Sequence, residues 1–184
     1  RSLVIVDRGP TTRYRMLETI RQYARERLIE SGEAAEIADR HMGFFSALAA
    51  AAAPELRGPS MVDWLDRVDA DLDNLGSALE WGLELSPDGA IRLCASLLTY
   101  WRARVPSPDN EERIMAAIEA ARALLAGPPE PTPEQRAVAA RLLGDAAVIW
   151  SFAGRGPTAL GWAEEAVAAA RAGEDKGALI AALS

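Results

Sequence analysis

The stretch RYRMLETIRQYARERL, residues 13–28, decides how the rest of the chain is interpreted. Its apolar side chains recur at i, i+3, i+7 and i+11, which is the spacing of one helical face. These positions are Leu17, Ile20, Ala24 and Leu28, and Met16 and Tyr23 widen the stripe. Gly32 favours a helix end soon afterwards, because glycine accepts the left-handed conformation there. The stretch therefore predicts an amphipathic helix.

The residues before this helix have a different character. Leu3-Val4-Ile5-Val6 is apolar and mostly β-branched, and Arg8-Gly9-Pro10 is a turn signal. We expect a strand or hairpin that leads directly into the helix, with Tyr14 near the junction.

The rest of the chain has helical spacing, and alanine, the best helix former, is abundant. We predict an all-α fold, an antiparallel helical array of the α-solenoid kind, after a short N-terminal β-strand or hairpin. The glycine- and proline-rich stretch 127–131 is the one linker-like segment. The expected domains are residues 1–31, 32–126 and 127–184.

Local signals mark several helix ends. Thr132-Pro133-Glu134-Gln135 is a capping box, and Ser107-Pro108 is a cap followed by a first-turn proline. A break is expected within 71–74, because Asp and Asn favour helix starts over helix interiors. A turn is expected at 86–89. The helix near 33–53 should bury a stripe formed by Ile37, His41, Phe44 or Phe45, and Leu48.

The last hairpin, 133–153 and 157–173, resembles a tetratricopeptide unit. Leu143-Gly144 matches the Leu-Gly pair of the first helix, and Gly154, Ala159 and Ala166 match the turn glycine and the small packing residues. The separation along the sequence between Leu143-Gly144 and Gly154 is about one helical turn longer than a standard repeat of roughly 34 residues allows. The chain should stop inside a further helix, near 178–183.

Three stretches, in order, resemble STAND-type signal-transduction ATPases, including large LuxR-type transcriptional regulators. They are residues 13–24, 40–45 and 73–81. The resemblance covers roughly residues 2–85 well. It implies that the first residues are the end of a winged helix, that an ATPase module lies upstream, and that this chain belongs to the helical regulatory arm beyond it.

Composition and charge exclude several classes of function. The net charge is −7 and the sequence pI is about 4.9, so the surface repels phosphates and the fragment should not bind nucleic acid by itself. The lone cysteine, Cys94, fits a reducing cytoplasm. No apolar run is long enough to span a membrane, which takes about 18 residues. The start, Arg1, is neither a signal peptide nor an initiating Met, so the chain looks like a piece of a longer one.

No residues point to catalysis. The chain lacks a G-x-x-x-x-G-K-[ST] loop, so no cofactor is expected here and ATP would be held upstream. Residues 69–80 nearly fit a calcium loop, but Asn74 stands where a glycine must turn the chain. The alternative is a capped helix break. The single histidine, His41, is expected to be a partly buried, hydrogen-bonded core or interface residue, and a catalytic or sensor role is the alternative.

Two places are candidates for binding a partner. Trp101, Arg102 and Arg104 combine an aromatic ring with cations, which is typical of binding hot spots. The alternative is a core tryptophan beside arginines that neutralise a helix C-terminus. Arg21 and Arg25, at i and i+4, are candidates for docking on acidic residues of the ATPase module, and the alternative is a solvated face.

The predicted function is therefore that of a non-catalytic regulatory or sensor arm of a STAND-type transcriptional regulator. It would bind the upstream ATPase module and a protein or small-molecule effector. The alternative is a free-standing helical scaffold or adaptor unrelated to transcription. A helical enzyme would need convergent acid–base groups, and the sequence offers none.

Overall fold

The computed structural model describes residues 4–8 and 12–173, and its contacts group the chain into two compact units, 1–40 and 41–184. Each unit is described by itself. The domain boundaries expected at 31/32 and 126/127 stay predictions. The helix predicted near 178–183 lies outside the described residues.

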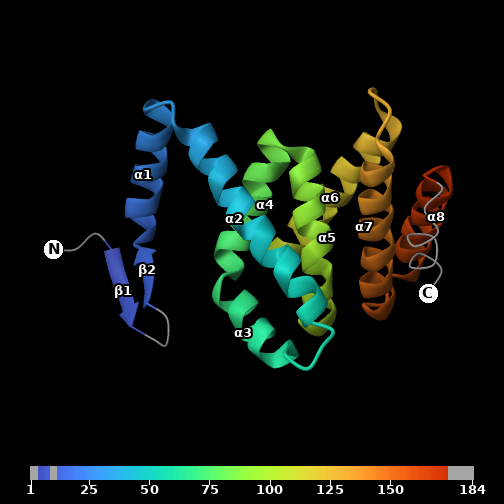
Figure 1. Cartoon of the computed structure of the whole chain (residues 1–184), viewed down its shortest axis with the longest axis horizontal. Helices are drawn as coiled ribbons and strands as arrows, with labels where there is room; N and C mark the ends of the chain where they lie inside the picture. Colours follow the sequence, from blue (N-terminus) through green and yellow to red (C-terminus); the bar gives the residue numbers. More distant parts are fainter. Residues whose placement is uncertain (1–3, 9–11, 174–184) are drawn as a thin grey trace. The chain divides into compact units, whose positions relative to one another are not determined.

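The first unit consists of a hairpin and a helix. Strands β1 (Val4–Arg8) and β2 (Thr12–Met16) pair antiparallel, with Val6 opposite Tyr14. Helix α1 (Glu18–Glu30) follows after Leu17, whose backbone is still extended. The expected hairpin that leads into a helix is confirmed (Figure 1).

The helix begins later than the sequence suggests. Residues 13–16 belong to β2, because their backbone pairs with β1 instead of closing helical hydrogen bonds. The predicted stripe is also incomplete as a buried face. Ile20, Ala24 and Leu28 are partly buried, whereas Met16, Leu17 and Tyr23 are exposed.

The second unit is helical throughout its described part. Helix α2 (Ala34–Glu55) begins in the first unit, and six helices follow it. They are α3 (Met61–Ala70), α4 (Leu72–Leu85), α5 (Pro87–Ala103), α6 (Pro108–Ala126), α7 (Pro133–Phe152) and α8 (Gly156–Ala172). The predicted fold class, an all-α helical array after a short hairpin, is confirmed.

The helix starts follow the local chemistry closely. The capping box at Thr132 is complete, with hydrogen bonds between Thr132 and Gln135 in both directions. Ser107 accepts a hydrogen bond from the Asn110 amide. The predicted break is present at Asp71, between α3 and α4. The turn expected at 86–89 is wrong beyond Ser86, because Pro87 already forms the first turn of α5.

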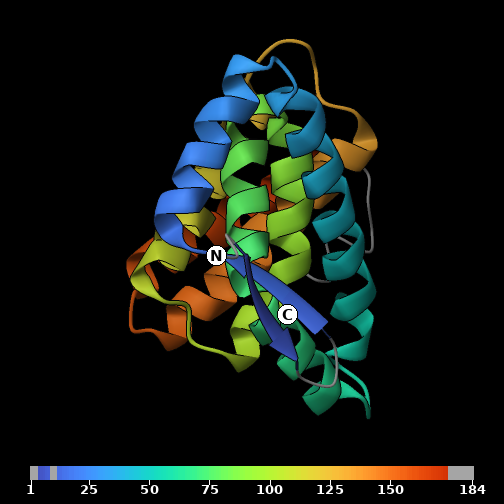
Figure 2. The ribbon, with the colours of Figure 1, turned by 90° about the vertical axis from the view of Figure 1, so that its left-hand side faces the viewer.

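Helix α5 lies at the centre of the unit. Residues 97–101 are all buried, so the helix is covered on every side. It packs against α4, α6 and α7, and α4 and α5 run side by side in both views (Figure 1 and Figure 2). One continuous cluster of buried side chains extends from Phe45 in α2 to Ala166 in α8.

The expected stripe of α2 is confirmed except at Ile37. Phe45 and Leu48 join this cluster, and His41 is partly buried against the Phe45 ring. Ile37 is exposed instead, and of the two phenylalanines between which the sequence left the choice open, Phe44 is the exposed one. Phe44 and Phe45 are neighbours on a helix and point in different directions, so only one of them can face the core.

Each helix from α3 to α6 is joined by an arginine–carboxylate pair to the helix two places further along. The pairs are Asp69–Arg104, Glu80–Arg113, Arg92–Glu134 and Arg122–Glu165, with N···O distances of 3.2, 2.7, 2.5 and 2.5 Å. Their partners are 35, 33, 42 and 43 residues apart. The same kind of link therefore recurs along the chain. The linked residues are 33–35 positions apart in the first two links and 42–43 positions apart in the last two.

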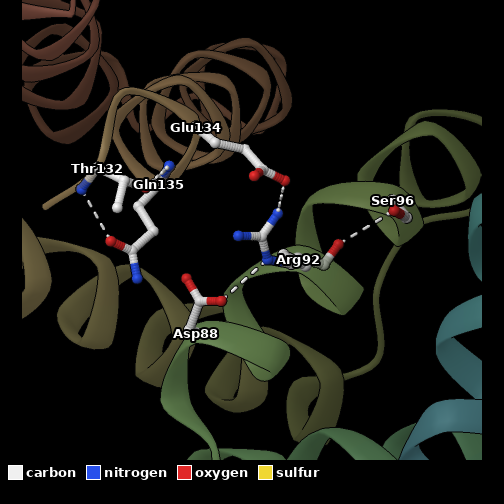
Figure 3. A network of polar contacts seen from close by, with 6 residues as sticks. All are labelled: Asp88, Arg92, Ser96, Thr132, Glu134 and Gln135. Carbon is white, nitrogen blue, oxygen red and sulfur yellow. Dashed lines mark hydrogen bonds and ion pairs between the residues drawn. The ribbon is translucent and has the colours of Figure 1, made fainter.

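Arg92 shows how such a link is built (Figure 3). Its Nε donates to Asp88 within α5, and its Nη1 donates to Glu134 in the first turn of α7. Glu134 also suits a helix N-terminus, where the backbone dipole favours negative charge. Because Arg102, near the other end of α5, lies close to Asp145 further along α7, α5 and α7 run in the same direction.

Helices α7 and α8 form the predicted hairpin, with Gly154 at φ 76° in the turn. Trp150 and Trp162 meet edge to face with their ring centroids 5.2 Å apart, so both are core residues as expected. Leu143, Gly144 and Ala166 are buried where the helices meet. The tetratricopeptide assignment stays a prediction, and the interval of 42–43 residues exceeds the usual period of about 34.

Leu143→Ala tests this packing. Leu143 is 0% exposed, so its truncation should lower the free energy of unfolding by about 2–5 kcal/mol through lost burial and a residual cavity. Leu160→Ala is the matched control, because Leu160 on α8 is 62% exposed and should change stability by less than about 0.5 kcal/mol. Urea unfolding measures both. Equal losses in the two variants would contradict the α7–α8 arrangement.

Candidate interaction surface

The C-terminal end of α5 carries three of the five candidate binding residues. Trp101 is 4% exposed and packs in the core, so it is not part of an exposed groove. Arg102 and Arg104 lie at the helix end with side chains 49% and 46% exposed. The structure thus separates the tryptophan from the arginines, and the core interpretation of Trp101 holds.

Arg104 links α5 to α3. Its Nη2 and Nε lie 3.2 and 3.4 Å from Asp69 Oδ2, and the Tyr100 hydroxyl donates to Asp69 Oδ1 at 2.5 Å. Burial, together with this neighbouring carboxylate, raises the pKa of Tyr100. Asp69 is therefore fully engaged by α5, and Arg104 has a structural partner.

Arg102 belongs to a different group of side chains. Its Nη1 lies 4.0 Å from Oδ1 of Asp145 on α7, and Arg141 precedes Asp145 by one helical turn. From the loop between α2 and α3, Arg57 donates to the Thr99 hydroxyl at 3.3 Å, one turn before Arg102. We call Arg57, Arg102 and Arg141 the arginine cluster, with Asp145 among them.

Asp145 sits in this cluster under opposing influences. Its side chain is 17% exposed, and burial raises its pKa because a carboxylate loses hydration there. The three arginines act in the other direction and favour the charged form, but burial outweighs them. The guanidinium groups are therefore only loosely engaged with this carboxylate.

No sequence pattern marks Arg57, Arg141 or Asp145 as site residues. Arg57 precedes Gly58-Pro59 and looks like an ordinary loop residue, and Arg141 and Asp145 are an ordinary i, i+4 pair. Only the packing of α5 against α7 brings these segments together. The spacing of Arg141 and Asp145 indicates a shared face but not what lies opposite it.

The other candidate pair, Arg21 and Arg25, lies on α1 in the first unit, and both side chains are exposed. Each takes part in at least one further interaction, so neither side chain is free. Nearby, Arg27 bonds to Glu30 and to the Tyr23 hydroxyl and lies over the Tyr23 ring. Docking by Arg21 and Arg25 stays a prediction.

The calcium-loop positions are committed to other contacts. Asp69 holds Tyr100 and Arg104, and Glu80 accepts two hydrogen bonds from Arg113 of α6, at 2.9 and 2.7 Å. Asn74 donates to Asp71 across the break between α3 and α4. Within residues 4–8 and 12–173, no three His, Cys, Asp or Glu side chains are grouped to hold a metal ion.

The remaining single groups are packing residues. Burial lowers the pKa of His41, whose ring centroid lies 4.6 Å from that of Phe45. Cys94 is fully buried in α5, and burial raises the pKa of its thiol. Among the described helices, none combines the length and apolar character that a membrane crossing needs.

Comparison with known proteins adds a relationship to this geometry. The whole chain aligns with part of provisionally named HTH-type transcriptional regulators of Mycobacterium bovis and Mycobacterium tuberculosis, at 32% identity over 194 aligned positions. The chain spans about 21% of the length of these relatives. No protein-family model and no solved structure matches it. The chain is thus similar to one region of these transcriptional regulators.

Added calcium should not stabilise the chain. About 1 mM Ca²⁺ should leave the melting temperature unchanged, because binding would have to break the contacts of Asp69 and Glu80 and would lack the turn glycine. Thermal unfolding followed by circular dichroism measures this. A rise of several degrees that Asp71→Ala removes would show a true calcium loop instead of a helix break.

The buried carboxylate predicts a pH dependence. Because burial raises the pKa of Asp145 in the folded chain, the folded state holds this proton more tightly than the unfolded state. Stability from this group should rise as the pH falls through the folded pKa. Relative to Asp145→Asn, the parent should therefore gain free energy of unfolding between about pH 7 and about pH 4.

Asp73→Asn, at an exposed aspartate of α4, is the control for loss of a surface carboxylate. Urea unfolding of the three chains at several pH values gives the differences. A stability difference between the parent and the Asp145→Asn variant that does not change with pH would contradict the burial of Asp145.

Proposed function

We propose that this chain is a non-catalytic regulatory or sensor arm of a STAND-type ATPase transcriptional regulator of the LuxR kind, working in the cytoplasm. The observation that carries the proposal is the similarity along the whole chain to HTH-type transcriptional regulators. Since the chain spans about 21% of those proteins, nucleotide and DNA binding would belong to other parts of the regulator. The sequence resemblance at residues 13–24, 40–45 and 73–81 supports the STAND assignment.

The first unit supports a role in joining two modules. Of the residues in 1–40 whose burial is described, Ala38 alone is buried, and large apolar side chains such as Leu17, Tyr23 and Ile29 are exposed. A two-stranded hairpin and a helix of 13 residues are marginal by themselves in water. In the proposal, the upstream ATPase module covers these side chains and Arg21 and Arg25 dock on its acidic residues.

The second unit would supply the sensing part. Repeated helix pairs present extended surfaces on which partners and effectors bind. The arginine–carboxylate links between helices two places apart hold such a surface in one shape. The proposal assigns no cofactor and no catalytic residue to this chain, and ATP would be bound upstream.

Charge reversal on α1 tests the proposal. Arg21→Glu with Arg25→Glu should change the stability of the isolated chain by less than about 1 kcal/mol, as is usual for exposed positions. In the full-length regulator the same pair should alter ATP turnover and expression of a reporter gene. Arg171→Glu, at an exposed arginine of α8, is the matched control and should change neither.

Two results would count against this function. Unchanged ATP turnover and unchanged reporter expression in the double variant would show that Arg21 and Arg25 are solvated surface residues without a docking role. The sequence upstream of Arg1 in the gene decides between the two classes of protein. A phosphate-binding loop there supports the regulator, and a chain without one supports a free-standing scaffold.

A further inference from the structure

The arginine cluster differs from six other arginine sites in the described part of the second unit. Six arginines there lie 2.5–3.2 Å from a carboxylate oxygen: Arg92, Arg104, Arg113, Arg122, Arg136 and Arg155. In the cluster, Arg102 lies 4.0 Å from Asp145, and the charges of Arg57 and Arg141 also act on this carboxylate. Two positive charges are left over after Asp145 is counted, in a chain whose net charge is −7.

The cluster is assembled from three separate segments. Arg57 comes from the loop after α2, Arg102 from the end of α5, and Arg141 from the middle of α7. Arg57 bonds to Thr99, Thr99 and Arg102 share a helix face, and Arg102 approaches Asp145. Arg141 lies one turn before Asp145 on α7, and its charge acts on that carboxylate. All three arginines keep substantial exposure, so a solute can reach them.

A structural explanation covers part of this arrangement. The C-terminus of α5 favours cations, which accounts for Arg102. It does not account for Arg57 and Arg141, which come from other segments. One hydrogen bond to Thr99 uses one of the five N–H donors of Arg57. Guanidinium groups offer paired donors that match the oxygens of phosphate and carboxylate groups.

We propose that Arg57, Arg102 and Arg141 form a binding site for a doubly charged oxyanion group, of which a phosphate monoester is the simplest example. Two negative charges match the excess charge of the cluster. Asp145 then acts as an internal competitor that holds the arginines in place when the site is empty and weakens anion binding. A bound anion links the α2–α3 loop, α5 and α7.

Titration of the 184-residue chain with inorganic phosphate and with pyrophosphate, at constant ionic strength, tests the proposal. Calorimetry should detect saturable binding. Arg102→Gln and Arg141→Gln should each weaken it about tenfold or more, because each removes charge-assisted hydrogen bonds. Asp145→Asn should strengthen it several-fold, because the competing charge is removed. A purely structural carboxylate would not produce that gain.

Arg104→Gln is the matched control. Arg104 lies two residues from Arg102 with nearly the same exposure, but it is paired with Asp69. Its removal should leave anion affinity unchanged. Circular dichroism confirms that each variant is folded. Absence of saturable binding to both probes, or equal weakening by Arg104→Gln and Arg102→Gln, would overturn the proposal.

Succinate and citrate, titrated in the same way, identify the chemistry of the natural group. Binding of phosphates alone indicates a phosphorylated ligand, and binding of the carboxylates as well indicates a general oxyanion site. The idea that the bound anion is the effector of the regulator rests on the proposed function. Anion binding to the isolated chain does not depend on the proposed function. A chain that binds phosphate while the Arg21/Arg25 variant leaves the regulator unchanged would separate the two proposals.

Discussion

The burial of residues 97–101 of α5 on every side is the constraint on which the second unit depends. Five consecutive residues, 97–101, are buried, so neighbours must cover the helix all round. Helices α4, α6 and α7 provide that cover. Burial of this kind is nondirectional and does not by itself fix how far one helix slides along another. The arginine–carboxylate links fix the position of one helix along the other, because each link joins two particular residues on helices two places apart.

The same links distinguish arginines that are paired with a carboxylate from those of the arginine cluster. Most arginines in the described part of the second unit are held by a nearby carboxylate, and exposed pairs of this kind contribute little stability, typically under about 1 kcal/mol each. Their value lies in geometry. Where three arginines gather around the largely buried Asp145, the balance is different. Positive charge is concentrated there on an otherwise acidic chain, and three segments meet at one point.

Sequence patterns predicted the features that depend on neighbouring residues. The capping box at Thr132, the cap at Ser107 and the break at Asp71 were predictable, because each involves a few adjacent residues and backbone donors that need partners. The patterns failed where a choice depended on distant segments. The strand at 13–16 follows from pairing with β1, and the exposure of Ile37 follows from the packing of α2. The choice of Phe45 over Phe44 as the buried ring, which the sequence left open, follows from the same packing.

By itself the sequence determined the fold class, the helix boundaries near strong caps, and the core status of Trp150 and Trp162. These follow from helix propensity, local hydrogen bonding and apolar spacing. The tertiary structure alone decided that the charges of Arg57, Arg102 and Arg141 act together on Asp145, and that helices pair at intervals of 33–35 and then 42–43 residues. Long-range contacts of this kind arise from mutual packing of whole helices, and no local pattern encodes which charged side chains then come to face one another.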